Sequence, residues 1–302
     1  MKVQKKKVNM IKIRSNIHTF KMSPYSENKT ICKSGDIVTF ETLDCFCNCF
    51  LPESTVFGID NPKYSNPATG PLYIKDARCG DTLKIEIMDI QLGNIGVLVT
   101  GPVNKIFEEQ LKEFKVNRIK VENDIVNLTS NIKIQAKPMI GVIGVAINEE
   151  LSTSLPGVHG GNLDCSDITK GSTVYLPIFV EGGLLAIGDL HALMGDGEIG
   201  ECGLEIEGTV TVKVTLIKDK VISAPRIEKD NFIEIIGLGN TVEDACENAS
   251  LEMLRYMVHD LKIDNHEASK LLCLCSDLKI CQIVNQIKTV VCRIQKSILE
   301  NN

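Results

Sequence analysis

The sequence predicts an α+β fold, in which a β-rich, sandwich-like or barrel-like body carries a C-terminal helical segment packed on it. Up to about residue 240, runs rich in β-branched residues alternate with glycine-containing turns, a pattern typical of strands. After Gly239 the apolar residues recur at helical spacing. A chain of 302 residues can bury a full core. We expect one compact unit with segments 1–130, 131–240 and 241–302.

The strands of the body follow from alternation and from β-branched content. Residues 138–145 form an apolar, glycine-broken strand that differs from the others in having almost no polar residues. The remaining strands are expected at residues 37–40, 82–87, 173–179 and 209–216.

The C-terminal segment predicts three helices. Thr241 precedes Glu243 and Asp244 in the arrangement of a capped helix start. A second helix is expected from about Asn265 to Cys275. Ser276 is the expected N-cap of a third, whose apolar residues would pack against the core.

Composition excludes several functional classes. A net charge of −6 gives no electrostatic footprint for nucleic acid or an anionic membrane, and the only basic cluster is Lys5–Lys7. No apolar run reaches the roughly 20 residues that span a bilayer. The 12 cysteines are spread over a long chain without an export signal, so reduced thiols are expected. We therefore expect a soluble, cytoplasmic protein with no nucleic-acid or membrane partner.

The segment GDLHALMGDGE at residues 188–198 concentrates acidic and imidazole side chains among glycines. On a strand, Asp189 and His191 would point to one face, because alternate residues share a face. Asp196 and Glu198 repeat this spacing in a glycine-rich turn. The preceding apolar residues favour burial, and buried charges need a cation or a substrate. The alternative is a satisfied core histidine beside a solvated hairpin loop.

A second polar segment, HGGNLD at residues 159–164, follows the apolar strand at 138–145. Glycines after a histidine let backbone N–H groups face a ligand as an anion-binding concavity. Asn162 and Asp164 again have alternate spacing. An ordinary polar loop with a Gly-Gly-Asn turn explains these residues as well as a ligand site does.

Residues 159–198 also resemble the central signature of the acetamidase/formamidase family of amide hydrolases. NPATGPLYI at residues 66–74 resembles the N-terminal motif of that family, and the order of the remaining segments is similar over essentially the whole chain. The resemblance implies hydrolysis of a short-chain primary amide to a carboxylate and ammonia, by a homo-oligomer.

The chemistry of amide hydrolysis suggests roles for the polar residues. Amides are unreactive, so an enzyme must polarise the carbonyl, activate a water and protonate the leaving nitrogen. No Gly-Ser-x-Gly nucleophile motif is present, and Cys165 is the only thiol beside these motifs, so a metal-activated water is the first hypothesis. Mixed carboxylate and imidazole ligands suit zinc best, with calcium or manganese as alternatives.

The expected metal ligands are Asp189 and His191, joined by Asp44 and by Asp164 or His18. Glu198 is the expected general base, with Asp196 orienting it or the leaving ammonia, and Glu205 is held in reserve. Asn162, His159, Gly160 and Gly161 are expected to bind the substrate or stabilise the oxyanion. Two rival hypotheses remain: a hydrolase of a cyclic or larger amide or ureide, and a non-enzymatic module that binds a metal or a small molecule.

Overall fold

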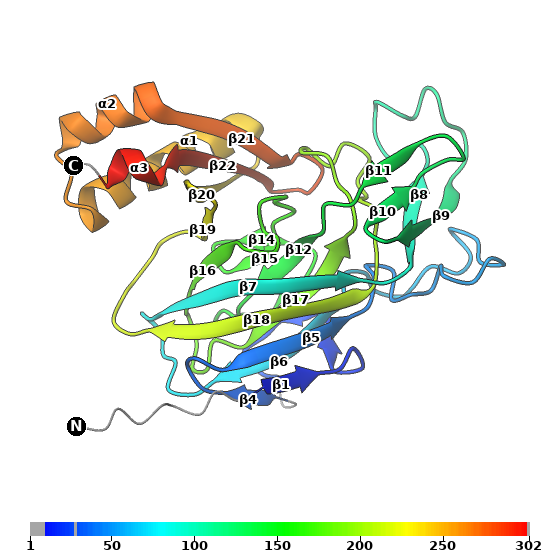
Figure 1. The fold of residues 1–302 in the computed structure, drawn as a ribbon, viewed down its shortest axis with the longest axis horizontal. Coiled ribbons are helices and arrows are strands. Elements are labelled where there is room, and N and C mark those ends of the chain that lie inside the picture. The colour runs from blue at the N-terminus through cyan, green and yellow to red at the C-terminus, as the bar shows by residue number, and fades with distance from the viewer. Residues whose placement is uncertain (1–9, 27–28, 301–302) are drawn as a thin grey trace.

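The largest element of the computed structural model, which describes residues 10–26 and 29–300, is a nine-stranded sheet (Figure 1). At its centre β7 and β18 pair antiparallel over ten residues of β18, and alternate residues of β18 such as Val210, Val212 and Val214 are buried. The period of two that predicts a strand therefore also fixes which face meets the core. In order, the strands are β1 (Met10–Ile13), β5 (Ile37–Thr42), β18 (Gly208–Ile217), β7 (Thr82–Leu92), β16 (Thr173–Pro177), β19 (Arg226–Lys229), β20 (Phe232–Gly239), β22 (Lys288–Gln295) and β21 (Ser276–Gln282).

A second sheet of seven strands packs against the first. Its central strands β12 and β17 are buried at every residue, and one hydrophobic cluster joins Ile187 of β17 to Val212 of β18 in the first sheet. A strand that is covered on both faces reads as a continuous apolar run, as β12 does. Its strands are β14 (Pro156–Gly157), β15 (Gly160–Asn162), β12 (Met139–Gly144), β17 (Leu185–His191), β6 (Ala68–Ile74) and β2 (His18–Thr19), with β4 (Thr30–Cys32) also paired to β6.

Two smaller sheets complete the body. The four-stranded sheet is ordered β11 (Lys133–Gln135), β10 (Ile125–Asn127), β9 (Lys115–Glu122) and β8 (Ile95–Thr100), and β13 (Leu151–Ser152) pairs with β3 (Lys21–Met22). The four-stranded sheet and the C-terminal helices occupy different corners of the molecule (Figure 1).

The C-terminal helices lie on the end of the nine-stranded sheet and have a hydrophobic cluster of their own. Ala245, Ala249 and Met253 of α1 pack with residues of β20 and β22. A Cβ atom on Gly237 of β20 would lie 2.2 Å from backbone atoms of α1, so glycine is required for this close approach. The helices are α1 (Val242–Arg255), continued by the π-helix η1 (Tyr256–Asp260), then α2 (Asn265–Cys275) and α3 (Lys296–Leu299).

The β-rich body with a helical C-terminal segment is confirmed, but the third predicted helix is wrong. The residues from Ser276 onward form the antiparallel hairpin β21–β22. β22 pairs with β20 over eight residues, so the sheet edge of β20 supplies hydrogen bonds that a helix would have made internally. The β-branched run Thr289–Val291 fits this strand. In the described part of the chain, no helix is both long and apolar enough to cross a membrane.

Candidate active site

Asp189 and His191 stand at the end of β17 and share one face, as their spacing predicts. Both are buried, and His191 Nε2 lies 3.7 Å from Asp189 Oδ1. Asp189 adopts the left-handed backbone conformation, with φ of 56°. This conformation is uncommon outside glycine and, where it persists in a packed structure, often marks a functional position.

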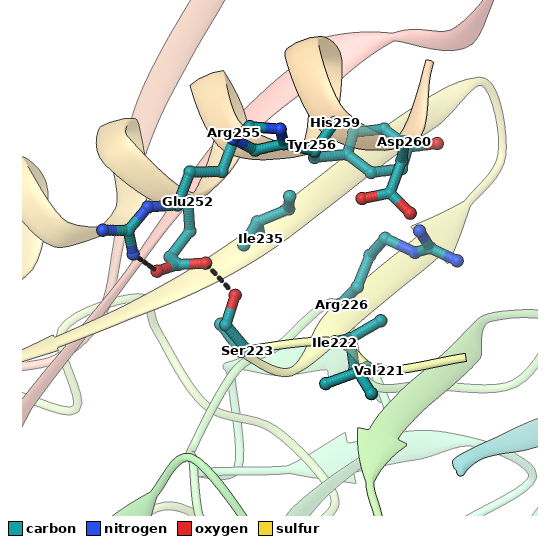
Figure 2. A pocket seen from close by; sticks show the side chains of 11 residues that line it. Val221, Ile222, Ser223, Arg226, Ile235, Glu252, Arg255, Tyr256, His259 and Asp260 are labelled. Carbon is teal, nitrogen blue, oxygen red and sulfur yellow. Dashed lines mark hydrogen bonds and ion pairs between the residues drawn. The ribbon is translucent and has the colours of Figure 1, made fainter. Parts of the chain in front are cut away.

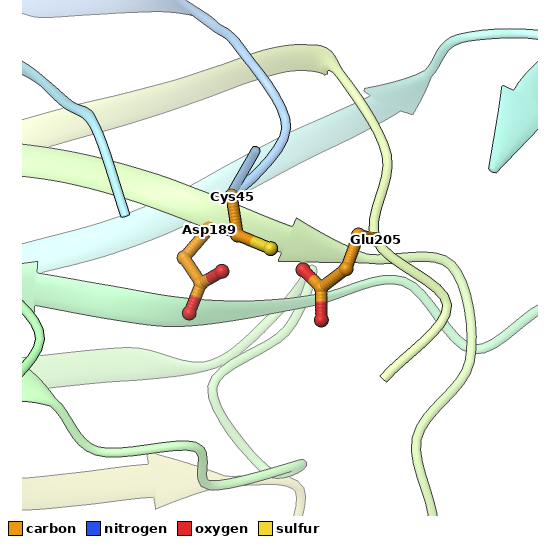
Figure 3. Close-up of side chains that lie close together, drawn as sticks. All are labelled: Cys45, Asp189 and Glu205. Carbon is orange, nitrogen blue, oxygen red and sulfur yellow. The ribbon is translucent and has the colours of Figure 1, made fainter. Parts of the chain in front are cut away.

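Glu205 is the carboxylate closest to His191. Its Oε1 lies 3.1 Å from His191 Nε2 and accepts a hydrogen bond of 3.0 Å from the backbone N–H of Gly203. Glu205 also joins Cys45 and Asp189 in a group whose potential ligand atoms all lie within 4.8 Å of one another (Figure 3). The residue held in reserve by the sequence reasoning is therefore central to the site.

Asp164 and Glu198 complete the cluster from two other segments. One potential ligand atom from each of Asp164, His191 and Glu198 lies within 4.8 Å of the others. Asp164 follows β15 and approaches Asp189 above Gly141 of β12. A Cβ atom on Gly141 would lie 2.6 Å from Asp164 Oδ1 and 2.5 Å from Asp189 Oδ2, so only glycine leaves room for both carboxylates.

Burial and mutual repulsion shift the protonation of this cluster. Burial, followed by the charge of Asp189, raises the pKa of Asp164 to about 7. Burial raises the pKa of Glu205 to about 7 against the opposing effect of His191. The pKa of Glu198 rises to about 10, through burial and then the charge of Asp164. Burial opposes protonation of His191, but the carboxylates of Glu205 and Asp189 outweigh it and raise its pKa.

Several atoms of the cluster have no hydrogen-bond partner. Among the residues that the structure describes, this holds for the buried atoms Asp164 Oδ1, His191 Nε2 and Glu205 Oε2. Within residues 10–26 and 29–300, no Lys or Arg side chain forms an ion pair with Asp164, Asp189, Glu198 or Glu205. Apart from His191, the described residues thus offer these carboxylates no cationic side chain, and buried carboxylates in excess of their cationic partners are costly. A donor set of carboxylates and one imidazole fits a divalent cation such as zinc or manganese.

Two of the predicted metal ligands, Asp44 and His18, lie outside this cluster. Asp44 is buried, and its Oδ1 accepts hydrogen bonds from the backbone N–H groups of Phe46 and Asn48. Burial, and more weakly the charges of Glu207 and Asp189, raise its pKa to about 6, so Asp44 borders the cluster. His18 lies in β2 with its Nδ1 2.7 Å from the carbonyl oxygen of Ser15, outside both ligand groups.

Asp196 is exposed and belongs to neither ligand group around His191 and Asp189. It accepts a hydrogen bond of 2.6 Å from the hydroxyl of Ser166 and lies 3.4 Å from Lys279 Nζ. Its spacing from Glu198 predicted that the two would act together, whereas the turn separates them.

His159 and Asn162 are buried in and next to β15, on the same sheet as β17. Asn162 Oδ1 and His159 Nε2 have no hydrogen-bond partner among the described residues. Burial lowers the pKa of His159 to about 4, which keeps the imidazole neutral. Gly160 and Gly161 have positive φ, and a Cβ atom on either would lie 2.2 Å from a backbone oxygen. The two glycines therefore allow close packing of the strands.

Cys165 belongs to a different cluster from its neighbour Asp164. Its thiol lies within 4.8 Å of potential ligand atoms of Asp167 and Glu234. A hydrogen bond with Cys281 and burial raise its pKa well above the usual value. A thiol held in its protonated form is a poor nucleophile, which disfavours a cysteine mechanism.

Two asparagines that the sequence reasoning did not assign to the site reach its carboxylates. Asn66 Nδ2 donates to Asp189 Oδ2 at 3.4 Å, and Asn285 Nδ2 donates to Asp164 Oδ2 at 3.3 Å. Asn66 belongs to the NPATGP motif, and its polar side chain before a proline could have indicated a site residue. Asn285 lies in the loop between β21 and β22, and nothing in its local sequence indicated that the loop returns to the site.

Comparisons with known proteins agree with this fold. A sequence model described as the acetamidase/formamidase family matches residues 91–286. The crystal structure of an acetamidase from Bacillus halodurans has a TM-score of 0.92 and 39% identity, covering 96% of this chain and 99% of that one. A predicted acetamidase/formamidase from Thermoanaerobacter tengcongensis has a TM-score of 0.92 and 33% identity, covering 97% of each chain.

A curated relative matches over a shorter region. The formamidase of Methylophilus methylotrophus is 51% identical over 77 residues, which are 25% of this chain and 19% of that protein. The matched part thus spans about a fifth of the length of this relative. Since the family model covers well over half of the chain and the full-length structures share a third or more of its residues, the chain belongs to the acetamidase/formamidase family.

Proposed function

We propose that this protein is an amidohydrolase that cleaves a short-chain primary amide, of the acetamide or formamide type, to a carboxylate and ammonia. The observation that carries the proposal is the group of buried carboxylates around the single imidazole of His191. Such a group can hold a cation, activate water and transfer protons, which are the requirements of amide hydrolysis. Membership of the acetamidase/formamidase family supports the same reaction.

In this proposal a divalent cation, with zinc as the first choice and calcium or manganese as alternatives, is held by Asp164, Asp189 and His191. A cation there would polarise the amide carbonyl and lower the pKa of a water molecule. Asp164 and Asp189 converge above Gly141, and the unpartnered atoms of Asp164 and His191 are available as donors. Glu205 Oε1 lies 3.1 Å from the same His191 Nε2, so Glu205 would stand beside the cation as a further carboxylate.

Glu198 is the general base of the proposed reaction. Its carboxylate lies within 4.8 Å of donor atoms of Asp164 and His191, close enough to receive a proton from the attacking water. After burial, the charge of Asp164 is the largest cause of its raised pKa. A cation that neutralised Asp164 would remove that repulsion and lower the pKa of Glu198. The ionised carboxylate could then accept a proton from water and pass it to the leaving nitrogen.

Asn162 is the proposed contact for the substrate amide. Its unpartnered, buried Oδ1 can accept a hydrogen bond from the NH₂ group of a primary amide. Gly160 and Gly161 pair with strands on both sides of β15, so their backbone groups serve the sheet. Asp196 has no part in the reaction, because its carboxylate is held at the surface by Ser166 and Lys279.

The test is ammonia release from formamide, acetamide and propionamide, before and after removal of metal and with metal restored. We expect release that is lost on exhaustive chelation and returns with zinc. Release from none of these amides would contradict the proposed reaction. Full activity in metal-free protein would leave the reaction standing and remove the cation from it.

We also propose that the protein is a cytoplasmic homo-oligomer. The cysteines are free thiols, which supports a reducing compartment, and exposed apolar side chains such as Leu274 on α2 support association. Light scattering of the purified protein measures the number of subunits directly, and a monomer at working concentration would contradict this proposal.

A further inference from the structure

An apolar cleft of about 330 Å³ opens beside Glu198. One wall comes from the four-stranded sheet and the other from the segment that carries Glu198. A Cβ atom on Gly96 of β8 would lie 2.7 Å from the side chain of Leu204, so the two walls are tightly packed at their base. The apolar walls are formed by Leu98, Ile119 and Val126 on one side and by Leu193, Met194 and Leu204 on the other.

The cleft and the carboxylate cluster share a wall. Glu198 lines the cleft and also belongs to the ligand group of Asp164 and His191. Met194, another lining residue, has its sulfur 3.3 Å from His191 Nδ1. Gly203 also lines the cleft, and a Cβ atom there would lie 2.5 Å from the same nitrogen. A substrate whose amide group lies at Glu198 therefore has an apolar space directly beside it.

A second cavity in the protein has no connection to the carboxylate cluster. It measures about 240 Å³ and lies between α1 and the segment before β19 (Figure 2). Glu252 in its wall pairs with Arg255 and accepts a hydrogen bond from Ser223 (Figure 2). None of its lining residues belongs to the cluster around His191.

We infer that the apolar cleft binds the acyl chain of the substrate, so that the preferred substrates are aliphatic amides with an acyl chain longer than that of acetamide. This inference rests on the proposed amide hydrolysis. At roughly 30 Å³ for each water-sized group, a molecule as small as acetamide would leave most of the cleft to water. Each methylene moved from water to apolar walls favours binding about fourfold.

The experiment compares kcat/KM for ammonia release across formamide, acetamide, propionamide, butyramide, pentanamide and hexanamide. We expect kcat/KM to rise about fourfold with each methylene beyond acetamide and to level off when the cleft is full. Equal values across the series, or a maximum at formamide, would overturn the inference.

Variants that fill the cleft test whether the dependence of kcat/KM on chain length arises there. Val126→Phe should lower kcat/KM for pentanamide at least about tenfold and lower it for acetamide by a clearly smaller factor. Because Val126 is buried, Leu128→Trp at the exposed rim of the same cleft provides a second variant that does not disturb the core. Val221→Phe, at the exposed edge of the other cavity, is the matched control and should change neither substrate. Loss of acetamide and pentanamide turnover in equal measure would contradict a role in chain binding.

Calorimetric binding of acetate, butyrate and hexanoate separates the inference from the reaction. We expect affinity to rise with chain length in the unaltered protein and to lose that dependence in Leu128→Trp. If no amide is hydrolysed but this dependence is found, the proposed function fails and the cleft assignment stands. If acetamide is hydrolysed without any dependence of turnover or binding on chain length, the cleft assignment fails and the function stands.

Discussion

Strand β17 and the turn that follows it carry the same pattern of ionisable residues but place them differently. On β17, Asp189 and His191 are both buried and face each other. In the turn, Glu198 is buried whereas Asp196 is exposed and held by Lys279. β17 is held in register by its pairing with β12, which keeps Asp189 and His191 on one face although Asp189 has positive φ, whereas Gly197 and Glu198 lie in a turn and both have positive φ. Alternate spacing thus brings the two side chains together on the paired strand and not in the turn.

Substitution of the strand pair is expected to have the largest effect. Asp189→Asn or His191→Ala should lower kcat for ammonia release on the order of 10³-fold, because each removes a donor from the cluster that activates water. Bound metal should fall in parallel, and thermal melting shows whether the variant remains folded. A folded variant that keeps its metal and its turnover would show that the strand pair is not the site.

Asn285→Ala tests whether the C-terminal hairpin contributes to the cluster on the strand. Loss of the hydrogen bond to Asp164 should reduce kcat/KM about tenfold, because hydrogen bonds to charged groups are worth roughly 1.5–3 kcal/mol. The measurement is steady-state ammonia release, with Asn231→Ala, at an exposed site near α3, as the control. Identical kinetics in Asn285→Ala and the control would confine the role of the hairpin to packing.

Asp167→Asn tests the ion-pair network that borders the turn, and the expected effect is on stability. Burial opposes ionisation of Asp167, but hydrogen bonds from Lys279 and Lys229 outweigh it and lower its pKa. A lowered pKa stabilises the folded state above the unfolded value of about 3.9 and loses this contribution as pH falls through the folded value. We expect the substitution to cost roughly 1–3 kcal/mol at pH 7 and little once the pH has fallen below the folded-state pKa of Asp167.

Denaturant unfolding of the unaltered protein and Asp167→Asn at several pH values measures this difference. A stability difference that grows as pH falls would reverse the assigned sign. Ammonia release should stay within about twofold, since the network contacts Asp196 rather than Glu198.

Local spacing predicted the elements that depend only on local periodicity. The expected strands at 37–40, 82–87, 173–179 and 209–216 are β5, β7, β16 and β18, because alternation of apolar residues reports which face is buried. The hairpin β21–β22 was expected as a helix, because short apolar runs fit the period of a helix and that of a strand. The edge of β20 decides between the two, and it is distant in sequence.

The same distinction applies to the site. The shared face of Asp189 and His191 followed from spacing, whereas the contact of Glu205 with His191 depends on how the loop after Glu198 returns to the end of β17. Asn285 approaches Asp164 from 121 residues away. Such contacts arise from tertiary packing, and no local pattern encodes them.

The most direct test of the account is a side-by-side measurement of ammonia release by Glu198→Gln and Asp196→Asn in metal-loaded protein. The account predicts a loss of about 10²–10⁴-fold in Glu198→Gln, which keeps the shape of the side chain but removes the base. Asp196→Asn, which changes only an exposed ion pair, should stay within about threefold of the unaltered protein. Near-normal turnover in folded Glu198→Gln, or an equal loss in both variants, would contradict the account.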